Sequence, residues 1–427
     1  REVAVERVVA LGGMRGCRHH RAAHPPVARD AQRRRDVRAR RAADEQPLLA
    51  DEALHHREAL RVRHALGSIN DRRVKNVRRA ARPDALHRVA PVLVQKPPID
   101  EVREVFERRP NYFARLDEAA ETFHAGLSLA PGDDLAISLK AWLRSTHGIV
   151  VRALPVQTMP SLRRRYDRHS MRLFLSERLS PFDQLREVAM EVVLLALGEH
   201  VQAELEALEL SSGEARRIAR FELARYAAHA LMMPYGTFLS AAIRARYDID
   251  VLRARFNVSF EQAANRLTML QRPGATGVPF FMMEIDNAGN RFRRAGASGF
   301  PQAKFGGGCP KLNVHAAFAQ PGQVLVEQVE MPDGAAFLTM SRTLEGPQAS
   351  FGERIRRTAL LIGCDAASRD EVAYSAALPD RSQPAIAIGP ACRLCERSGC
   401  LARAEPPLTR PLGLDEMVTG LSAFDFQ

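Results

Sequence analysis

Residues 224–234 read ARYAAHALMMP, and this stretch decides how the middle of the chain folds. Apolar residues recur at helical spacing across residues 214–233, and proline cannot continue a helix because it lacks a backbone N–H. The pattern therefore predicts a long helix that ends at Pro234. The helix is apolar, so a single polar side chain on it, such as His229, is expected to be structural.

Working outward from this helix, the same spacing recurs on both sides. The segment 99–127 predicts two short helices that are broken at Pro110. Residues 148–154 and 172–175 have the character of strands, with a polar loop between them. Further helices are predicted over residues 133–146, 183–210, 237–246, 251–255 and 260–270.

After residue 279 the pattern changes from helices to strands. Two pairs of strand-like segments flank turn sequences, Asp-Asn-Ala-Gly at 286–289 and Met-Pro-Asp-Gly at 331–334. Another strand is predicted over 356–362, and a cysteine-rich loop over 384–407. A helical, mixed half followed by a strand-rich half predicts the α+β class.

Composition excludes several classes of protein. The 427 residues are 46% apolar and contain no apolar run near the ~18 residues that a membrane span needs. No signal peptide follows Arg1, so we expect a cytoplasmic protein without a membrane partner. Six cysteines are too few for a disulfide scaffold.

The net charge of +12 lies entirely in the segment 1–97, which has 23 Lys and Arg and 11 Asp and Glu. This segment has no aromatic residue, and its composition predicts disorder because little apolar surface can be buried. Two interpretations remain open: a basic arm that binds nucleic acid through phosphates, or a non-native extension translated from an upstream GC-rich frame.

The strongest chemical signal is the spacing C-x2-C-x4-C formed by Cys392, Cys395 and Cys400, with Cys364 upstream. Four thiolates are the ligands that a tetrahedral zinc ion or an iron–sulfur cluster requires. Gly399 allows a tight turn before the third thiol, and Cys309 is a possible fifth participant. Spacing alone leaves zinc, iron–sulfur, unligated thiols and a local disulfide as alternatives.

The stretch 224–234 resembles a segment of IrrE/ImmA-type metallopeptidase domains. In that family the preceding helix carries H-E-x-x-H, which holds zinc. Here Glu191 remains, but the two histidine positions are Met190 and Leu194, and His200 lies six residues further on. The resemblance therefore implies a peptidase-like fold that has lost its zinc site, and no enzyme activity.

Four segments together resemble the short-chain fatty-acyl transcriptional regulators, including the propionate-type regulators. The resemblance implies acyl-CoA binding, an iron–sulfur cluster on the cysteines, a homo-oligomer and DNA binding through an N-terminal helix-turn-helix. It also implies three parts: 1–97, an IrrE/ImmA-like domain 98–272 and a C-terminal domain 273–427. The matching segments are 251–270, 271–281, 305–318 and 392–407.

A helix-turn-helix pattern is missing from the segment 1–97, so DNA binding by this chain is in question. The pattern of residues 252–270 is typical of a helix-turn-helix. Their second helix, however, offers only Gln262, Asn265 and Arg266 to read bases. We therefore expect these residues to form a small helical pair that packs on the core.

An acyl-CoA site needs cations or backbone amides for the phosphates and an apolar slot for the acyl chain. The basic and glycine-rich stretch around residues 291–315 offers both. The candidate ligand residues are Arg291, Arg293, Arg294, Lys304, Phe305, Gly306, Gly307, Cys309 and His315. Three alternatives to an acyl-CoA sensor remain: a structural zinc module, a zinc metallopeptidase and a non-specific nucleic-acid-binding arm.

Overall fold

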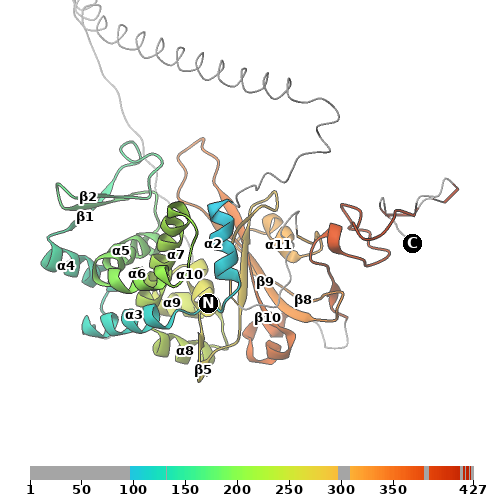
Figure 1. Ribbon diagram of the computed structural model, residues 1–427, viewed down its shortest axis with the longest axis horizontal. Helices are drawn as coiled ribbons and strands as arrows, with labels where there is room; N and C mark the ends of the chain where they lie inside the picture. The colour runs from blue at the N-terminus through green and yellow to red at the C-terminus, as the bar shows by residue number, and fades with distance from the viewer. Residues whose placement is uncertain are drawn as a thin grey trace, which may run out of the picture. The chain divides into compact units, whose positions relative to one another are not determined.

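The computed structural model describes residues 97–130, 132–296, 308–378, 384–413, 417–418, 420–422 and 424. They belong to one compact unit, Gln95–Gln427. The predictions for the segment 1–97 lie outside the described residues, except at its last residue. The unit mixes helices and strands, which confirms the α+β class (Figure 1).

Helices dominate the first part of this unit. The two helices predicted around Pro110 are present as α2 and α3, and the helical pair predicted over 252–270 is present as α9 and α10. The helices are α2 (Pro98–Glu107), α3 (Ala114–Gly126), α4 (Leu135–His147), α5 (Pro181–Ala196), α6 (Gly198–Glu206), α7 (Gly213–Met232), α8 (Tyr235–Arg244), α9 (Ile249–Phe256) and α10 (Phe260–Leu267).

The helix ends follow the capping signals in the sequence. The Ser212 hydroxyl accepts a hydrogen bond from a backbone N–H of α7, whose C-cap residue is followed by Pro234, as predicted. Ser259 and Gln262 form a capping box that starts α10. The single helix predicted over 183–210 is wrong: it breaks at Leu197, whose backbone is not helical and which precedes a glycine.

A small sheet lies beside the helices. The strands β1 (Val150–Leu154), β2 (Arg164–Asp167) and β3 (Arg172–Ser176) form it in the order β1-β3-β2. β1 runs parallel to β3, and β2 runs antiparallel to it. The polar loop predicted between the first two strands therefore contains a strand of its own, because its side chains alternate between the core and solvent.

The second part of the unit is a six-stranded sheet, ordered β11-β8-β9-β10-β6-β7. The two predicted hairpins are present as β6–β7 and β8–β9, and β9 pairs with β10 over nine residues. The strands are β6 (Phe281–Ile285), β7 (Arg291–Gly296), β8 (Leu325–Glu330), β9 (Ala336–Glu345), β10 (Arg357–Asp365) and β11 (Ile386–Ala387). The short strands β4 (Gln271–Arg272) and β5 (Ala275–Thr276) pair separately.

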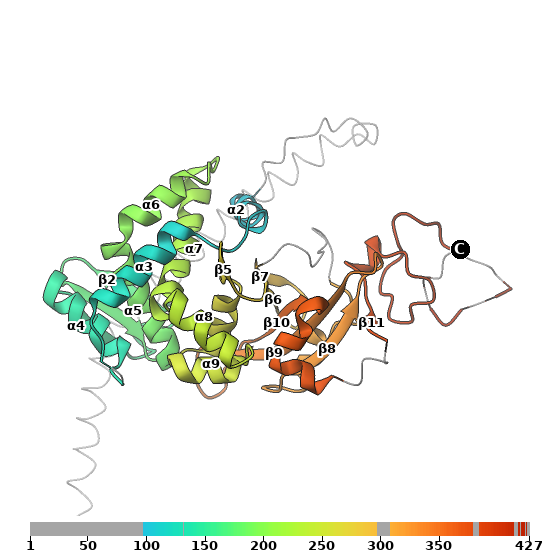
Figure 2. The same ribbon diagram turned by 90° about the horizontal axis from the view of Figure 1, so that it is seen from below.

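Two hydrophobic clusters cover the two faces of the large sheet. The larger one joins the helices to one face, where Leu360 and Ile362 of β10 point. The smaller one lies on the opposite face, where Ala359 and Leu361 pack against the short helix α11 (Asn313–Ala316). Side chains that alternate along β10 thus belong to different clusters. Figure 2 shows the helices on one side of this sheet and the C-terminal segment at its far end.

Within the larger cluster a fully buried ion pair ties three helices together. Arg266 of α10 donates two hydrogen bonds of 2.8 Å to the Asp117 carboxylate of α3. The Tyr226 hydroxyl of α7 donates to the same carboxylate at 2.7 Å. Gln262, Asn265 and Arg266 are all buried, so the described structure keeps these side chains away from any DNA base.

Candidate functional site

A cavity of about 1240 Å³ lies where the helices meet the large sheet. Its walls come from α2, α5, α7, α9, α10 and β2 on one side and from β6, β7, β9 and β10 on the other. The volume exceeds the ~300–1,000 Å³ of ordinary small-molecule pockets. The cavity therefore has room for a large ligand that touches both parts of the unit.

The lining of this cavity is strongly charged and unbalanced. Eleven arginines line it against seven Asp or Glu side chains, which leaves an excess of four positive charges. The unit as a whole is close to neutral, because residues 98–427 carry 39 Lys and Arg and 39 Asp and Glu. Arginine is therefore enriched in the lining, and the carboxylates that pair with five of these arginines lie outside it. Guanidinium groups that face a cavity favour an anionic ligand.

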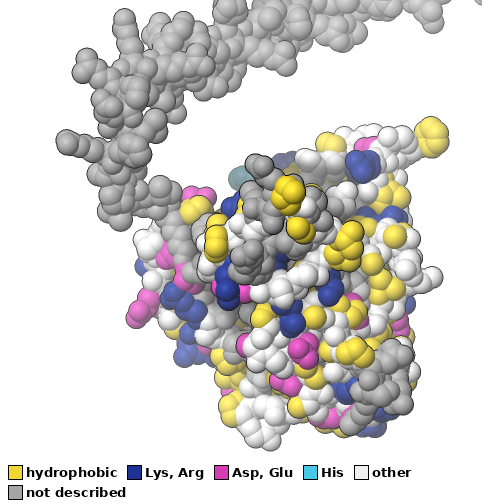
Figure 3. Space-filling view, turned by 90° about the vertical axis from the view of Figure 1, so that its right-hand side faces the viewer, with side chains coloured by type: hydrophobic (Ala, Val, Ile, Leu, Met, Phe, Trp, Pro, Cys, Tyr) yellow, Lys and Arg dark blue, Asp and Glu magenta, His cyan; other side chains and the backbone are white. Residues whose placement is uncertain are grey.

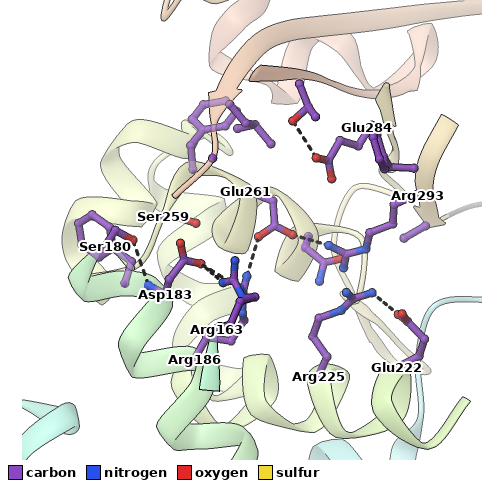
Figure 4. Close-up of a pocket in the computed structure, with 18 of the residues that line it drawn as sticks. Arg163, Ser180, Asp183, Arg186, Glu222, Arg225, Ser259, Glu261, Glu284 and Arg293 are labelled. Atoms are coloured by element: carbon purple, nitrogen blue, oxygen red, sulfur yellow. Dashed lines mark hydrogen bonds and ion pairs between the residues drawn. The ribbon is translucent and has the colours of Figure 1, made fainter. Parts of the chain in front are cut away.

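Glu261 of α10 is the centre of a charged cluster in this cavity, as Figure 4 shows. It forms ion pairs with Arg186 of α5 and with Arg293 of β7. Burial alone would raise the pKa of Glu261, but Arg293 and Arg186 outweigh it and lower that pKa to about 2. The carboxylate is thus ionised at all physiological pH values and holds the two arginines in place.

A further cation in the cavity comes from Arg225 of α7, which is ion-paired with Glu222 on the same helix. Burial lowers the pKa of Arg225, and the charge of the nearby Arg293 lowers it further. An anion that binds beside a desolvated guanidinium stabilises it, because the attraction offsets the repulsion from the neighbouring cations. Arg225, Arg293 and Arg186 are thus the cations that surround Glu261 in the lining.

The positions at which a metallopeptidase would hold zinc lie next to this cavity. Met190 lines it, whereas Leu194 packs on the hydrophobic core. Glu191 forms an ion pair of 3.0 Å with Arg164 of β2, and burial raises the pKa of Glu191. Neither zinc-ligand position offers an imidazole, and the remaining glutamate has a structural partner.

The isolated histidine of α7 is structural in the described part of the chain. His229 is fully buried, and its Nδ1 atom lies 2.6 Å from the Asn265 amide of α10. Burial lowers the pKa of His229 well below its ordinary value, so the ring is neutral. His200, the other histidine considered from the sequence, lies on α6 and does not line the cavity.

The structure places only some of the residues predicted to bind acyl-CoA at the cavity. Arg293 and Arg294 of β7 line the cavity, and Arg291 on the same strand pairs with Glu107 of α2 at 3.7 Å. Lys304, Phe305, Gly306 and Gly307 lie outside the described residues.

The other two predicted ligand residues do not line the cavity. Cys309 belongs to the smaller hydrophobic cluster, on the opposite face of the large sheet. His315 lies in α11, which packs on that same face, and burial lowers its pKa. The two residues are therefore separated by the sheet from Arg293, although they are close to it in sequence.

The structure also separates Cys364 from the other predicted metal ligands. Cys364 on β10 is fully buried in the larger cluster, on the helical face of the sheet, and burial raises its pKa to about 12. Cys309 lies on the other face and is the neighbour of the C-terminal thiols. Burial raises the pKa of Cys309, and the charges of Cys392 and Cys395 raise it further.

Gly389 marks the point where these thiols approach each other. Its backbone N–H donates to the Cys309 sulfur, and a Cβ atom placed on it would lie 2.5 Å from the Cys395 sulfur. Cys309, expected as a possible fifth participant, is therefore near Cys392 and Cys395, whereas Cys364 lies in the cluster on the other face of the sheet. Among the residues that the structure describes, no three His, Cys, Asp or Glu side chains are arranged closely enough to hold a metal ion.

The cysteine-rich segment is organised around one buried arginine. Arg403 donates to the backbone carbonyls of Cys392 at 3.2 Å, Cys395 at 3.1 Å and Arg397 at 2.6 Å. The backbone N–H of Ala404 donates to the Cys392 sulfur at 3.4 Å. These bonds curl the segment around the Arg403 guanidinium.

The end of the chain beyond the thiols is less buried. It exposes Leu401, Leu408 and Val418, and Figure 3 shows hydrophobic side chains dispersed among polar and charged ones on the face at this end. No helix in the described part of the chain is both long and apolar enough to cross a bilayer.

Sequence reasoning missed the cations of α5 and α7 and the carboxylate of α10 that build the cavity. Arg186, Arg225 and Glu261 come from three segments and follow no motif in the sequence. The one available signal was that a charged residue interrupts an apolar helix, as Arg225 does in the stretch 224–234.

Family models match two consecutive parts of the chain. The model described as "Short-chain fatty acyl coenzyme A regulator, C-terminal" matches residues 269–424. The model described as "IrrE N-terminal-like domain" matches residues 144–268.

Curated relatives and a solved structure are similar over more than three quarters of the chain. The HTH-type transcriptional regulator RamB of Mycobacterium tuberculosis is 38% identical over 330 residues, which are 77% of this chain and 69% of that protein. The propionyl-CoA carboxylase regulator of Cereibacter sphaeroides is 36% identical over 332 residues, again 77% and 69%.

A solved structure titled "Mycobacterium tuberculosis transcriptional regulator" superposes with a TM-score of 0.73 at 32% identity. It covers 77% of this chain and 99% of that one. The likeness in sequence and in fold thus extends over both matched parts. The chain belongs to the family of short-chain fatty acyl coenzyme A regulators.

Proposed function

We propose that this protein is a transcriptional regulator that senses a short-chain acyl-CoA in the cavity between its helices and its large sheet. The excess of four arginines in the lining carries this proposal. Coenzyme A has a phosphomonoester and a pyrophosphate, together about four negative charges near pH 7. The lining thus has as many arginines in excess as the ligand has charges, and the carboxylates that pair with five of these arginines lie outside the lining.

The apolar part of the lining suits the acyl end of such a ligand. Phe182, Met190 and Phe260 line the cavity beside the charged cluster at Glu261. Met190 stands where a peptidase would have a zinc-binding histidine, so an apolar contact replaces a catalytic one. Neither Met190 nor Leu194 can hold a zinc ion that would activate water. We therefore infer that a thioester in this cavity is bound rather than hydrolysed.

Binding there would couple the ligand to the arrangement of the protein. The cavity is lined by helices on one side and by four strands on the other, so a bound ligand contacts both. A ligand that binds one arrangement of these parts more tightly shifts the population toward it. DNA affinity would change with that shift, and the named relatives make DNA the expected partner.

We further propose that Cys309, Cys392, Cys395 and Cys400 hold an iron–sulfur cluster, with zinc as the alternative. Four thiols in an electropositive setting are suitable ligands for either. The proximity of Cys309 to Cys392 and Cys395 supports this set over one that includes Cys364. The segment around Cys400 would have to close further around Cys309 for all four sulfurs to ligate.

Calorimetric titration of the full chain with propionyl-CoA, coenzyme A and free propionate tests the ligand proposal. We expect propionyl-CoA to bind, and Arg293→Gln to weaken it by about ten-fold or more, since a hydrogen bond to a charged group contributes about 1.5–3 kcal/mol. Arg255→Gln is the matched control, because Arg255 is exposed on α9 outside the cavity. Absence of binding to the unsubstituted protein would contradict the proposal.

Anaerobic purification with iron, sulfide and zinc analysis tests the thiol site. Brown protein with iron and sulfide that are lost in Cys395→Ala supports a cluster. Colourless protein with stoichiometric zinc supports the structural zinc module instead. Protein with neither metal contradicts both.

A further inference from the structure

The small three-stranded sheet has a core face and a solvent face, set by the alternation of its strands. Leu173 and Leu175 of β3 are buried in the larger cluster, and Arg164 of β2 pairs with Leu175 on that inner face. Phe174 lies between the two leucines in sequence and therefore points outward. Arg172 is two residues away from Phe174 and shares its direction.

Cross-strand pairing places two more arginines on the outer face. Arg152 of β1 and Arg165 of β2 both pair with Phe174, one on each side of it. Neighbouring strands lie about 4.8 Å apart, so the Cα atoms of these two arginines are roughly 10 Å apart with the phenyl ring between them. Arg152, Arg165 and Arg172 are all exposed. We call this surface the arginine face.

The segment around this face is much more basic than the unit as a whole. Residues 135–172 hold eight Lys and Arg but a single acid, Asp167, whereas residues 98–427 as a whole are balanced. The inward Arg164 and the neighbouring Arg163 have partners, since they form ion pairs with Glu191 and Glu187 of α5. The three arginines of the arginine face form no ion pair with any carboxylate in the described residues.

We propose that the arginine face binds the phosphate backbone of duplex DNA without reading its sequence. Planar guanidinium groups match phosphate oxygens and are held here on a rigid sheet rather than on a loop. One half-buried phenylalanine is too little for the stacking platform that single-stranded nucleic acid requires. Arg164 on the inner side of β2 lines the cavity, whereas Arg152, Arg165 and Arg172 do not, so the arginine face is a separate site. The small sheet that carries it is shown in Figure 1.

This inference rests on the proposed role in transcription, because that role brings the protein to DNA. The body of the protein would then contact the backbone beside the site to which a specific domain binds. Such contacts raise affinity uniformly across sequences and make it depend on salt.

The test uses the full chain and the triple variant Arg152→Gln, Arg165→Gln, Arg172→Gln. Its matched control, Arg216→Gln, Arg217→Gln, Arg244→Gln, removes the same charge from exposed positions on α7 and α8. Fluorescence anisotropy with a labelled duplex of random sequence gives the affinity at several salt concentrations. Three lost phosphate contacts lower the slope of log K against log salt by about 2.7 in the triple variant alone.

Two outcomes overturn the inference: an unchanged slope in the triple variant, or an equal change in the control. Vesicles of phosphatidylglycerol and phosphatidylcholine are titrated in parallel, and a loss of vesicle binding with unchanged DNA binding would assign the face to a membrane surface. Propionyl-CoA titration of the triple variant separates this inference from the proposed function, because the cavity is intact in it. Normal ligand binding with an unchanged salt slope refutes only the arginine face.

Discussion

Replacing Glu261 by glutamine removes the carboxylate that holds the charged cluster of the cavity together. In the folded protein its pKa is about 2, against 4.5 ordinarily. A difference of about 2.5 pKa units corresponds to about 3 kcal/mol of stability. We therefore expect Glu261→Gln to lower the free energy of unfolding at pH 7 by about 3 kcal/mol, since Arg186 and Arg293 lose their shared partner.

The sign of the pH dependence follows from the direction of this shift. The folded pKa of Glu261 is depressed, so the stabilisation is complete above pH 4.5 and is lost as the pH falls toward 2. The difference between the unsubstituted protein and Glu261→Gln is thus constant between pH 5 and 8. It decreases by about 1.4 kcal/mol per pH unit below 4.5.

Urea unfolding measures this difference, with fluorescence of Trp142 as the probe. Trp142 is the single tryptophan of the chain, and it packs edge-on against Phe123 in the helical part. Glu345→Gln is the control, because the Glu345 ion pair with Arg357 is exposed and contributes no more than about 1 kcal/mol. A loss below about 1 kcal/mol in Glu261→Gln, or a difference that varies between pH 5 and 8, would refute the reasoning.

Three other perturbations have defined outcomes. Asp117→Asn leaves the fully buried Arg266 without its counter-ion and lowers the urea unfolding free energy by about 3–5 kcal/mol, whereas Asp117→Leu with Arg266→Met costs much less. Burial raises the pKa of Glu327 to about 7, so the folded protein keeps a proton that the unfolded chain releases above 4.5. Stability then falls as the pH rises from 4.5 to 7, and Glu327→Gln, followed by thermal unfolding at each pH, abolishes up to about 3 kcal/mol of that fall. Cys309→Ala lowers the bound metal content and Cys364→Ala leaves it unchanged; elemental analysis showing the reverse would restore the ligand set first expected from the sequence.

Sequence patterns located most of the elements because the signals are local. Helical spacing and the proline that follows α7 predicted the helices, and turn residues predicted both hairpins of the large sheet. Where local signals were weak, the predictions failed. The break at Leu197 and the strand β2 depend on packing against neighbouring helices and on pairing with β3, and neither is encoded in a short window.

The candidate sites show the same division between local and non-local information. Spacing identified the cysteines and the loss of the zinc histidines at Met190 and Leu194. It also led to Cys364 as the fourth thiol, whereas the structure brings Cys309 to the C-terminal thiols. Strand alternation is the reason: Cys364 points to the helical face of the sheet, and Cys309 packs on the other.

The sequence by itself determined the α+β class, the order of the elements, the lost peptidase motif and the resemblance to a family of acyl regulators. Only the tertiary structure decided which charged side chains come together. Arg186, Arg225, Glu261 and Arg293 come from segments that are far apart along the chain, and they interact because the helices and the large sheet enclose one cavity. Electrostatic interactions depend on distance in space and on burial, and both are properties of the folded chain.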